Sequence, residues 1–173
     1  KKPLYRHIGA LYGNEKMTLP IPFCNVINGG RHAGNRLEMQ EFMIVPYKAR
    51  NFRTAMRIVS ETYHTLKKII QEKFGKNAVN VGDEGGFAPP LDDAEQALKL
   101  LRKAIAEAGY TDQLKIAIDA AASEFYTNGS YRLEKPYNSI QLMNYYIKLL
   151  KTFPIISIED PFEQDDFAPY KAL

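Results

Sequence analysis

Four acidic residues and one histidine stand at positions where their side chains could do chemistry. Asp119 and Glu159 each end a short apolar run, which is typical of the last residue of a buried strand. Glu41 opens another apolar run, Glu84 lies in the glycine-rich segment GDEGGFAP, and His32 lies in a second glycine-rich segment. Carboxylates and imidazoles transfer protons and bind cations or anions, so these five residues are the candidates for a site.

Asp119 and Glu159 are candidates for metal ligands. Burying a lone carboxylate is costly, so each needs a cation, a hydrogen-bond donor or a proton. Two carboxylates that converge suit Mg²⁺, which prefers oxygen ligands and keeps water or substrate in its remaining positions. The alternative is structural: each carboxylate caps the next helix or pairs with an arginine.

Glu84 is a candidate for a general acid. Its flanking glycines permit sharp turns and close approach of a ligand, and burial or nearby carboxylates would raise its pKa toward the range of a proton donor. The alternative is a solvated loop residue. His32 could contact an anionic substrate, and its alternative is simple exposure to solvent.

The apolar periodicity predicts the elements that hold these residues. The first two predicted strands are joined by about a dozen residues without a helical period, which favours an antiparallel pair. The last two are continuous apolar runs, as in a parallel α/β sheet buried on both faces. Residues 1–20 read as a short helical or turn segment and a linker. We predict strands at 23–28, 41–46, 115–119 and 155–159, and helices at 51–74, 92–108 and 139–150.

The sequence pattern also predicts details of these elements. The helix at 51–74 should bury one apolar stripe, which consists of Phe52, Met56, Val59, Tyr63, Leu66 and Ile70. The helix at 92–108 should start at Asp92, with Glu95 completing a capping-box-like pattern, and should end at Gly109. Its buried stripe should consist of Leu98, Leu101 and Ile105. The segment NGS is a hairpin-like turn signal.

The direction of the chain through these elements places all five candidates at one end of the sheet. The first, third and fourth strands finish at this end, and the second strand starts there if it is antiparallel to the first. In α/β barrels the active site lies at the C-terminal end of the strands. The prediction would fail for Glu41 if the first two strands were parallel.

Bulk properties exclude several classes of protein. The net charge is +3 and the basic residues are scattered among acids, so we expect no nucleic-acid partner. No apolar run reaches the roughly 18 residues of a membrane span. The single cysteine, Cys24, allows no internal disulfide and reads as a packing residue, which suits a reducing compartment such as the cytoplasm.

Four segments resemble the enolase family, in the same order and spacing. They are FCNVINGGRHAGNRLEMQEFMIVP, NVGDEGGFAP, KIAIDAAASEFY and PIISIEDPFEQDD. The resemblance implies an α/β fold that is the first half of an enolase-type β/α barrel, with the order strand, strand, helix, helix and then strand–helix repeats. It also implies that residues 1–20 end an N-terminal domain or linker and that residues 21–173 begin the catalytic barrel.

The resemblance also implies roles for the five candidates. Glu84 corresponds to the proton donor and Glu41 to its partner carboxylate. Asp119 and Glu159 correspond to ligands of a Mg²⁺ ion. His32, Glu41 and Glu159 correspond to residues that contact the substrate, and His32 lies on the loop that closes over it.

The implied activity is that of a glycolytic lyase, a cytoplasmic homodimer that interconverts 2-phosphoglycerate and phosphoenolpyruvate with Mg²⁺. In the family the base lysine and a third metal carboxylate lie on later strands, so this chain alone is expected to be inactive. Arg31 stands where the family commonly has a small or hydroxylated residue, and Glu38 stands where a small residue is more usual. The alternative is a non-catalytic, enolase-derived binding or structural protein.

Overall fold

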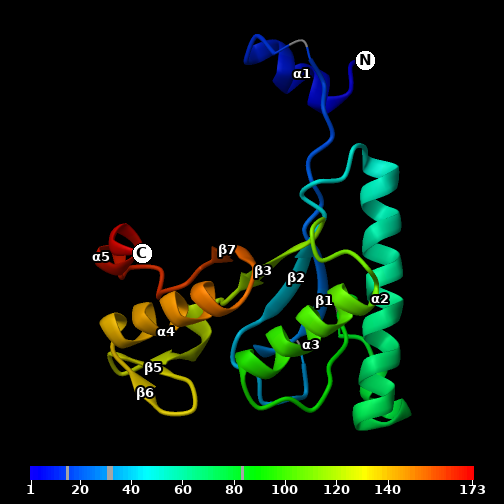
Figure 1. The fold of residues 1–173 in the computed structure, drawn as a ribbon. Coiled ribbons are helices and arrows are strands. Elements are labelled where there is room, and N and C mark those ends of the chain that lie inside the picture. Colours follow the sequence, from blue (N-terminus) through cyan, green and yellow to red (C-terminus); the bar gives the residue numbers. More distant parts are fainter. Residues whose placement is uncertain (15, 31–32, 83) are drawn as a thin grey trace.

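The computed structural model describes residues 1–14, 16–30, 33–82 and 84–173, which form a mixed α/β structure. Figure 1 shows α1 (Leu4–Leu11) apart from the body, joined to it by an extended segment. The other elements are β1 (Cys24–Asn28), β2 (Glu41–Val45), α2 (Phe52–Phe74), η2 (Lys76–Val79), α3 (Ala94–Glu107), β3 (Lys115–Asp119), η3 (Ala122–Phe125), β4 (Tyr126–Thr127), β5 (Ser130–Arg132), β6 (Pro136–Tyr137), α4 (Ser139–Thr152), β7 (Ile155–Glu159) and α5 (Phe167–Ala172).

The main sheet has four strands in the order β1-β2-β3-β7. Strand β2 pairs antiparallel with both β1 and β3, and β3 pairs parallel with β7. The predicted antiparallel arrangement of the first two strands is therefore confirmed. Within the described part of the chain the sheet stays open and does not close into a barrel.

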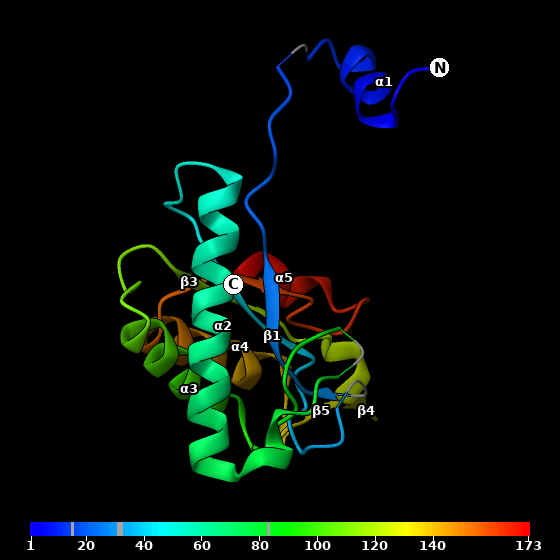
Figure 2. The ribbon, with the colours of Figure 1, turned by 90° about the vertical axis from the view of Figure 1, so that its right-hand side faces the viewer.

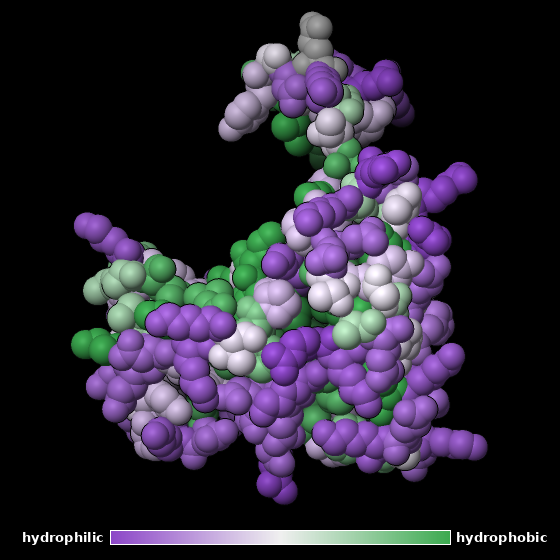
Figure 3. Space-filling model, viewed as in Figure 1, coloured by the Kyte–Doolittle hydropathy of each residue, from purple (hydrophilic) through white to green (hydrophobic). Residues whose placement is uncertain are grey.

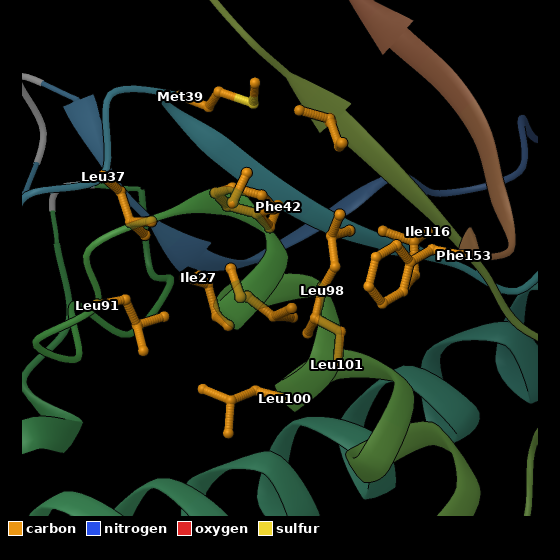
Figure 4. Close-up of a cluster of buried hydrophobic side chains, with 14 of the residues drawn as sticks. Ile27, Leu37, Met39, Phe42, Leu91, Leu98, Leu100, Leu101, Ile116 and Phe153 are labelled. Carbon is orange, nitrogen blue, oxygen red and sulfur yellow. The ribbon is translucent and has the colours of Figure 1, made fainter. Parts of the chain in front are cut away.

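The two faces of this sheet have different neighbours. Because side chains alternate along a strand, Phe42 and Ile44 point to one face, and Met43 and Val45 to the other. Phe42 and Ile44 belong to the large core that also holds the buried residues of α2 and α3, as Figure 4 shows for Phe42 and Leu98. Met43 and Val45 pack in a separate small cluster with Ala117. Figure 2 shows α2 running alongside β1. Among the described residues, α2 and α3 thus pack on the face that carries Phe42 and Ile44 and leave the face of Met43 and Val45 uncovered.

The long helix α2 begins at the N-cap Asn51, whose side chain accepts a hydrogen bond from the backbone N–H of Thr54 at 2.9 Å. The predicted apolar stripe is confirmed along its second half, where Leu66 and Ile70 are buried. It is wrong at the start, because Phe52 and Met56 are exposed to 41% and 39%. A helix of 23 residues is about twice as long as a strand of 5, so its first turns extend beyond the sheet.

Helix α3 follows the predicted pattern with its start displaced by one residue. The N-cap is Asp93, whose carboxylate accepts from the backbone N–H of Gln96 at 2.8 Å, and not Asp92 as the sequence pattern indicated. Gly109 takes a φ of 81° after the last turn, a conformation that glycine adopts without strain. The predicted buried stripe of Leu98, Leu101 and Ile105 is confirmed.

Strand β7 differs from its prediction as a strand buried on both faces. Among the described residues it pairs with β3 on one side only, and Ile156 is 50% exposed. An edge strand can have the same apolar sequence as a central one, so the apolar run alone did not distinguish them. The segment after β3 also forms a small three-stranded sheet, β4-β5-β6, of which the sequence indicated only the Asn128–Gly129 turn.

Apolar side chains are also exposed outside the body. Helix α1 buries none of its residues, and Leu4 and Leu11 are 72% and 74% exposed. Figure 3 shows apolar atoms on the side of α1 that faces the body and on the neighbouring rim of the body. None of the helices in the described residues is both long and apolar enough to cross a membrane.

Candidate active site

Strand pairing brings the predicted carboxylates together at one edge of the sheet. Glu41, the first residue of β2, lies opposite Asp119, the last residue of β3. Asp119 in turn lies beside Glu159, the last residue of β7. Side-chain alternation puts Glu41 on the same face as Met43, and Asp119 on the same face as Ala117. The carboxylates therefore project from the sheet face that the helices leave uncovered.

The charges at this edge raise the pKa values of two carboxyl groups. Burial, a hydrogen bond with Glu84 and the neighbouring negative charges raise the pKa of Glu41 to about 8. Burial, and to a lesser degree the charges of Glu159 and Asp160, raise the pKa of Asp119 to about 6, against a backbone hydrogen bond that lowers it. Near neutral pH, Glu41 thus keeps a proton and can share it with Glu84.

Asp119 is fixed by its neighbours in the chain and in the sheet. Its Oδ1 accepts from the backbone N–H of Ala121 at 3.0 Å, and its Oδ2 lies 3.5 Å from the donor Nε2 of Gln40. Ala121 has a φ of 46° and Asp160, directly after Glu159, has a φ of 42°. Such left-handed conformations cost free energy in residues other than glycine, and they cluster at functional sites.

We expect the substitution Ala121→Gly to raise the free energy of unfolding by up to about 1 kcal/mol. Glycine adopts the φ of 46° without steric cost, and its greater freedom in the unfolded chain offsets part of the gain. The matched control is Ala120→Gly, because Ala120 is fully buried and has no positive φ; this variant should be destabilised. Denaturant unfolding compares the two, and equal destabilisation would show that the backbone at Ala121 is not strained.

Glu84 reaches the site from a loop that is attached to β1. Phe87 forms a parallel bridge with Ile27, and its carbonyl accepts from the backbone N–H of Asn28 at 2.8 Å. The loop is also held to α2, because Tyr63 stacks on Phe87 and donates its hydroxyl to the carbonyl of Gly85 at 3.0 Å. Glu84 itself is exposed to solvent, as in the alternative of a solvated loop residue. It nevertheless forms a hydrogen bond with Glu41, so it also faces the other carboxylates.

The other predicted site residues have different outcomes. His32 and its neighbour Arg31 lie outside the described residues. Asp119 is half-buried, whereas Glu159 is exposed, so the expectation that both are buried is wrong for Glu159, which sits on the edge strand. Within the described residues neither carboxylate forms a salt bridge, which removes the arginine-pairing alternative there. Burial raises the pKa of the Cys24 thiol, which agrees with a packing residue.

Sequence reasoning missed several polar residues at this edge. Asp160 adds negative charge beside Asp119, and Gln40 contacts its carboxylate. Asn25 contacts Glu84, and Asn28 is fully buried at the end of β1. A polar residue within an apolar strand, as in CNVIN, was the only signal in the sequence that could have indicated the two asparagines.

The residues present fit a divalent cation in part. Asp119 and Glu159 offer carboxylate oxygens at the ends of adjacent strands. The negative charges near Asp119 raise its pKa, and a bound cation would neutralise them. Across residues 1–14, 16–30, 33–82 and 84–173, no group of three or more histidine, cysteine, aspartate or glutamate side chains is arranged to hold a metal ion. Two protein ligands suit Mg²⁺, which commonly binds through one or two carboxylates and keeps several waters.

Most of the chain matches a known family model. Residues 16–173 match a family model described as "Enolase, C-terminal TIM barrel domain". The match covers β1 to β7 and therefore every strand that carries a candidate residue.

Proposed function

The chain belongs to the enolase C-terminal TIM barrel domain family, and from this premise we propose that it carries the acid side of a glycolytic enolase site. The reaction is the reversible elimination of water from 2-phosphoglycerate to give phosphoenolpyruvate. The observation that supports this proposal best is the convergence of Glu41, Glu84, Asp119 and Glu159 at one sheet edge. A structural or binding role alone does not require four acidic side chains to face one another.

The elimination breaks the C2–H and C3–O bonds of the substrate and forms the C2=C3 double bond. The departing hydroxyl needs a proton to leave as water, and Glu84 is the proposed donor. Glu41, whose pKa of about 8 keeps it protonated near neutral pH, supports that role through its hydrogen bond with Glu84. With Glu41 protonated, the pair carries one negative charge less, which favours binding of an anionic substrate.

Asp119 and Glu159 are the proposed ligands of Mg²⁺, and His32, Glu41 and Glu159 the proposed substrate contacts. When bound, Mg²⁺ supplies positive charge against the negative charge that develops on the substrate, as is known of enolase-superfamily sites with one or two such ions and a lysine or histidine base. The protein's own contribution is to hold two carboxylates in register on adjacent parallel strands, where Gln40 and Ala121 fix the position of Asp119.

We also propose that the open sheet is the first half of the family's barrel. Its strand order, the free edge of β7 and the helices on one face agree with a barrel wall whose inner face carries the carboxylates. Residues 21–173 would then begin the catalytic barrel, and residues 1–20 would end a preceding domain or linker. The resemblance places the base on later strands, so these 173 residues alone are proposed to be inactive. A cytoplasmic homodimer is the proposed form of the complete protein.

The proposed function predicts that the complete protein converts 2-phosphoglycerate to phosphoenolpyruvate only with Mg²⁺ present. The measurement is the ultraviolet absorbance of the enol product, with and without a chelator, followed by restoration with excess Mg²⁺. The control substrate is 3-phosphoglycerate, which carries its phosphate on the carbon from which the hydroxyl should leave and should not react. Absence of turnover in all conditions would favour the non-catalytic alternative, and turnover unaffected by the chelator would contradict the metal assignment.

A further inference from the structure

Two asparagine side chains connect β1 to the proposed proton donor. The Nδ2 of Asn25 donates to the Oδ1 of Asn28 at 2.5 Å, and the same Nδ2 lies 3.4 Å from the Oε2 of Glu84. Asn28 is fully buried, and its backbone is fixed on both sides, by Phe87 through its N–H and by Asn35 through its carbonyl. Asn28 is thus fixed in the core, and the half-buried Asn25 extends from it to Glu84.

A β-bulge is the reason that these two amides meet. Residues three apart in a regular strand point to opposite faces of the sheet. Here Asn25 pairs with Met43 and Asn28 pairs with Glu41, and the register shifts between Asn25 and Ile27. The bulge therefore turns both asparagines to the face that carries Glu41, as bulges beside active sites commonly redirect side chains.

Gly86 provides the space that the pair occupies. A Cβ atom on Gly86 would collide with the Oδ1 of Asn28 and would lie 3.0 Å from the Oδ1 of Asn25. Gly86 has no positive φ, so glycine is required here for space and not for backbone conformation. The loop that carries Glu84 thus packs directly against the two amides.

The pair also has hydrogen-bonding capacity that the described residues do not use. The Oδ1 of Asn25 and the Nδ2 of Asn28 are buried without a hydrogen-bond partner in the described part of the chain. Unpaired buried polar atoms are costly, and native proteins tolerate few of them. An apolar pair of the same size would avoid this cost, so two amides at this position indicate a role beyond packing.

We propose that Asn25 is a positioning residue for Glu84, and that Asn28 and Gly86 set the position of Asn25. The amide N–H of Asn25 holds one oxygen of the Glu84 carboxyl and leaves the other for the proton that passes to the leaving hydroxyl. An N–H donor serves both forms of Glu84, because a carboxylate and the carbonyl oxygen of a carboxylic acid both accept hydrogen bonds. This role rests on the proposed function, in which Glu84 is the proton donor.

The test separates the acid half of the reaction from the base half. Removal of the C2 proton, measured as exchange of the 2-phosphoglycerate C2 hydrogen with solvent deuterium, precedes departure of the hydroxyl and uses a base elsewhere. The complete protein with Mg²⁺ is compared with Asn25→Leu, which removes the donor at similar size. We expect kcat to fall at least about tenfold with little change in KM, while C2 exchange stays within about threefold of wild type.

Two further variants complete the experiment. Asn51→Leu is the matched control, because it makes the same change at the exposed N-cap of α2, past the end of β2 that lies opposite Glu41. It should lower the melting temperature and leave the ratio of exchange to turnover unchanged. If Asn25→Leu does not fold, Asn25→Asp carries the same test, since it keeps the size and polarity and replaces the donor by an oxygen that repels Glu84.

Each result has a definite meaning. A wild-type protein with neither exchange nor turnover contradicts the proposed function itself. A wild-type protein that is active, with variants at Asn25 that retain full turnover, overturns the positioning role alone. The same holds if exchange and turnover fall by equal factors, because that pattern indicates a structural defect.

Discussion

The variant Glu84→Gln should lower the turnover of 2-phosphoglycerate at least about a hundredfold, with KM changed much less. Glutamine has the same shape as glutamate and can still accept a hydrogen bond from Asn25, but it has no acidic proton for the leaving hydroxyl. The loop itself should keep its position, because it is held by Tyr63 and by the pairing of Phe87 with β1, neither of which involves the Glu84 side chain. Steady-state kinetics at saturating Mg²⁺ give the measurement.

The control for this experiment is Glu107→Gln, the same chemical change at the exposed end of α3, where Glu107 pairs with Lys103 on its own helix. Its kinetics should match those of wild type. Glu84→Gln should also retain C2 hydrogen exchange, because the base half of the reaction does not need the acid. Normal turnover in Glu84→Gln would remove this residue from the mechanism and leave Glu41 as the remaining acid at the site.

The arrangement of the site followed from the direction of the chain. Once the strands at Glu41, Asp119 and Glu159 were predicted, a single assumption placed all three at one end of the sheet: that the first two strands run antiparallel. The length of their connection supported that assumption, and the pairing of β1 with β2 confirms it. The face that these carboxylates share was not predicted, because it depends on the register of the strands, which only the structure gives.

The asparagine pair could not be found in the same way, for a physical reason. A bulge breaks the alternation on which the assignment of faces depends, and nothing in the letters CNVIN marks its position. Regular alternation would put Asn25 and Asn28 on opposite faces. The position of the bulge is decided by the tertiary contacts of β1 with β2 and with Phe87.

Burial was predicted less well than position, because it depends on what lies beyond each element. The apolar pattern of α2 continued past the sheet, so Phe52 and Met56 were assigned to a core that does not reach them. The run IISIE satisfied the pattern of a central strand, yet in the part of the chain that the structure describes β7 has a neighbour on one side only. Periodicity describes which side chains are able to be buried, and the neighbouring elements determine which of them are.

The variant Asp119→Asn should weaken Mg²⁺ binding and have the opposite effect on the metal-free protein. Asparagine keeps the size and the acceptor for the Ala121 N–H but removes one of two carboxylates on which the proposed metal site depends. Loss of a charged ligand should reduce the Mg²⁺ affinity by about a hundredfold or more. Even residues that only hydrogen-bond to metal ligands typically contribute about ten- to a hundredfold to the affinity. Calorimetric titration with Mg²⁺ measures this change, and activity at fixed Mg²⁺ should fall with it.

The stability of the metal-free form follows from the raised pKa of Asp119. This carboxyl binds its proton more tightly in the folded state, with a pKa of about 6, than in the unfolded state, where its pKa has the ordinary value of 3.8. The free energy of unfolding therefore falls as pH rises between these two values, and above about 6 the full penalty of the charge is present. Asp119→Asn removes that penalty, so in chelator its melting temperature should exceed that of wild type at pH 8, and the difference should disappear toward pH 4.

The matched control is Asp112→Asn, at an exposed position before the start of β3 and therefore at the opposite end of that strand. It should leave the Mg²⁺ affinity unchanged. An Asp119→Asn variant that binds Mg²⁺ like wild type would show that the metal is held elsewhere. A second outcome would be an Asp119→Asn variant that is less stable than wild type in chelator at pH 8. The hydrogen bonds of Asp119 would then stabilise the fold by more than its charge destabilises it. That result would favour a structural role for Asp119 over metal binding.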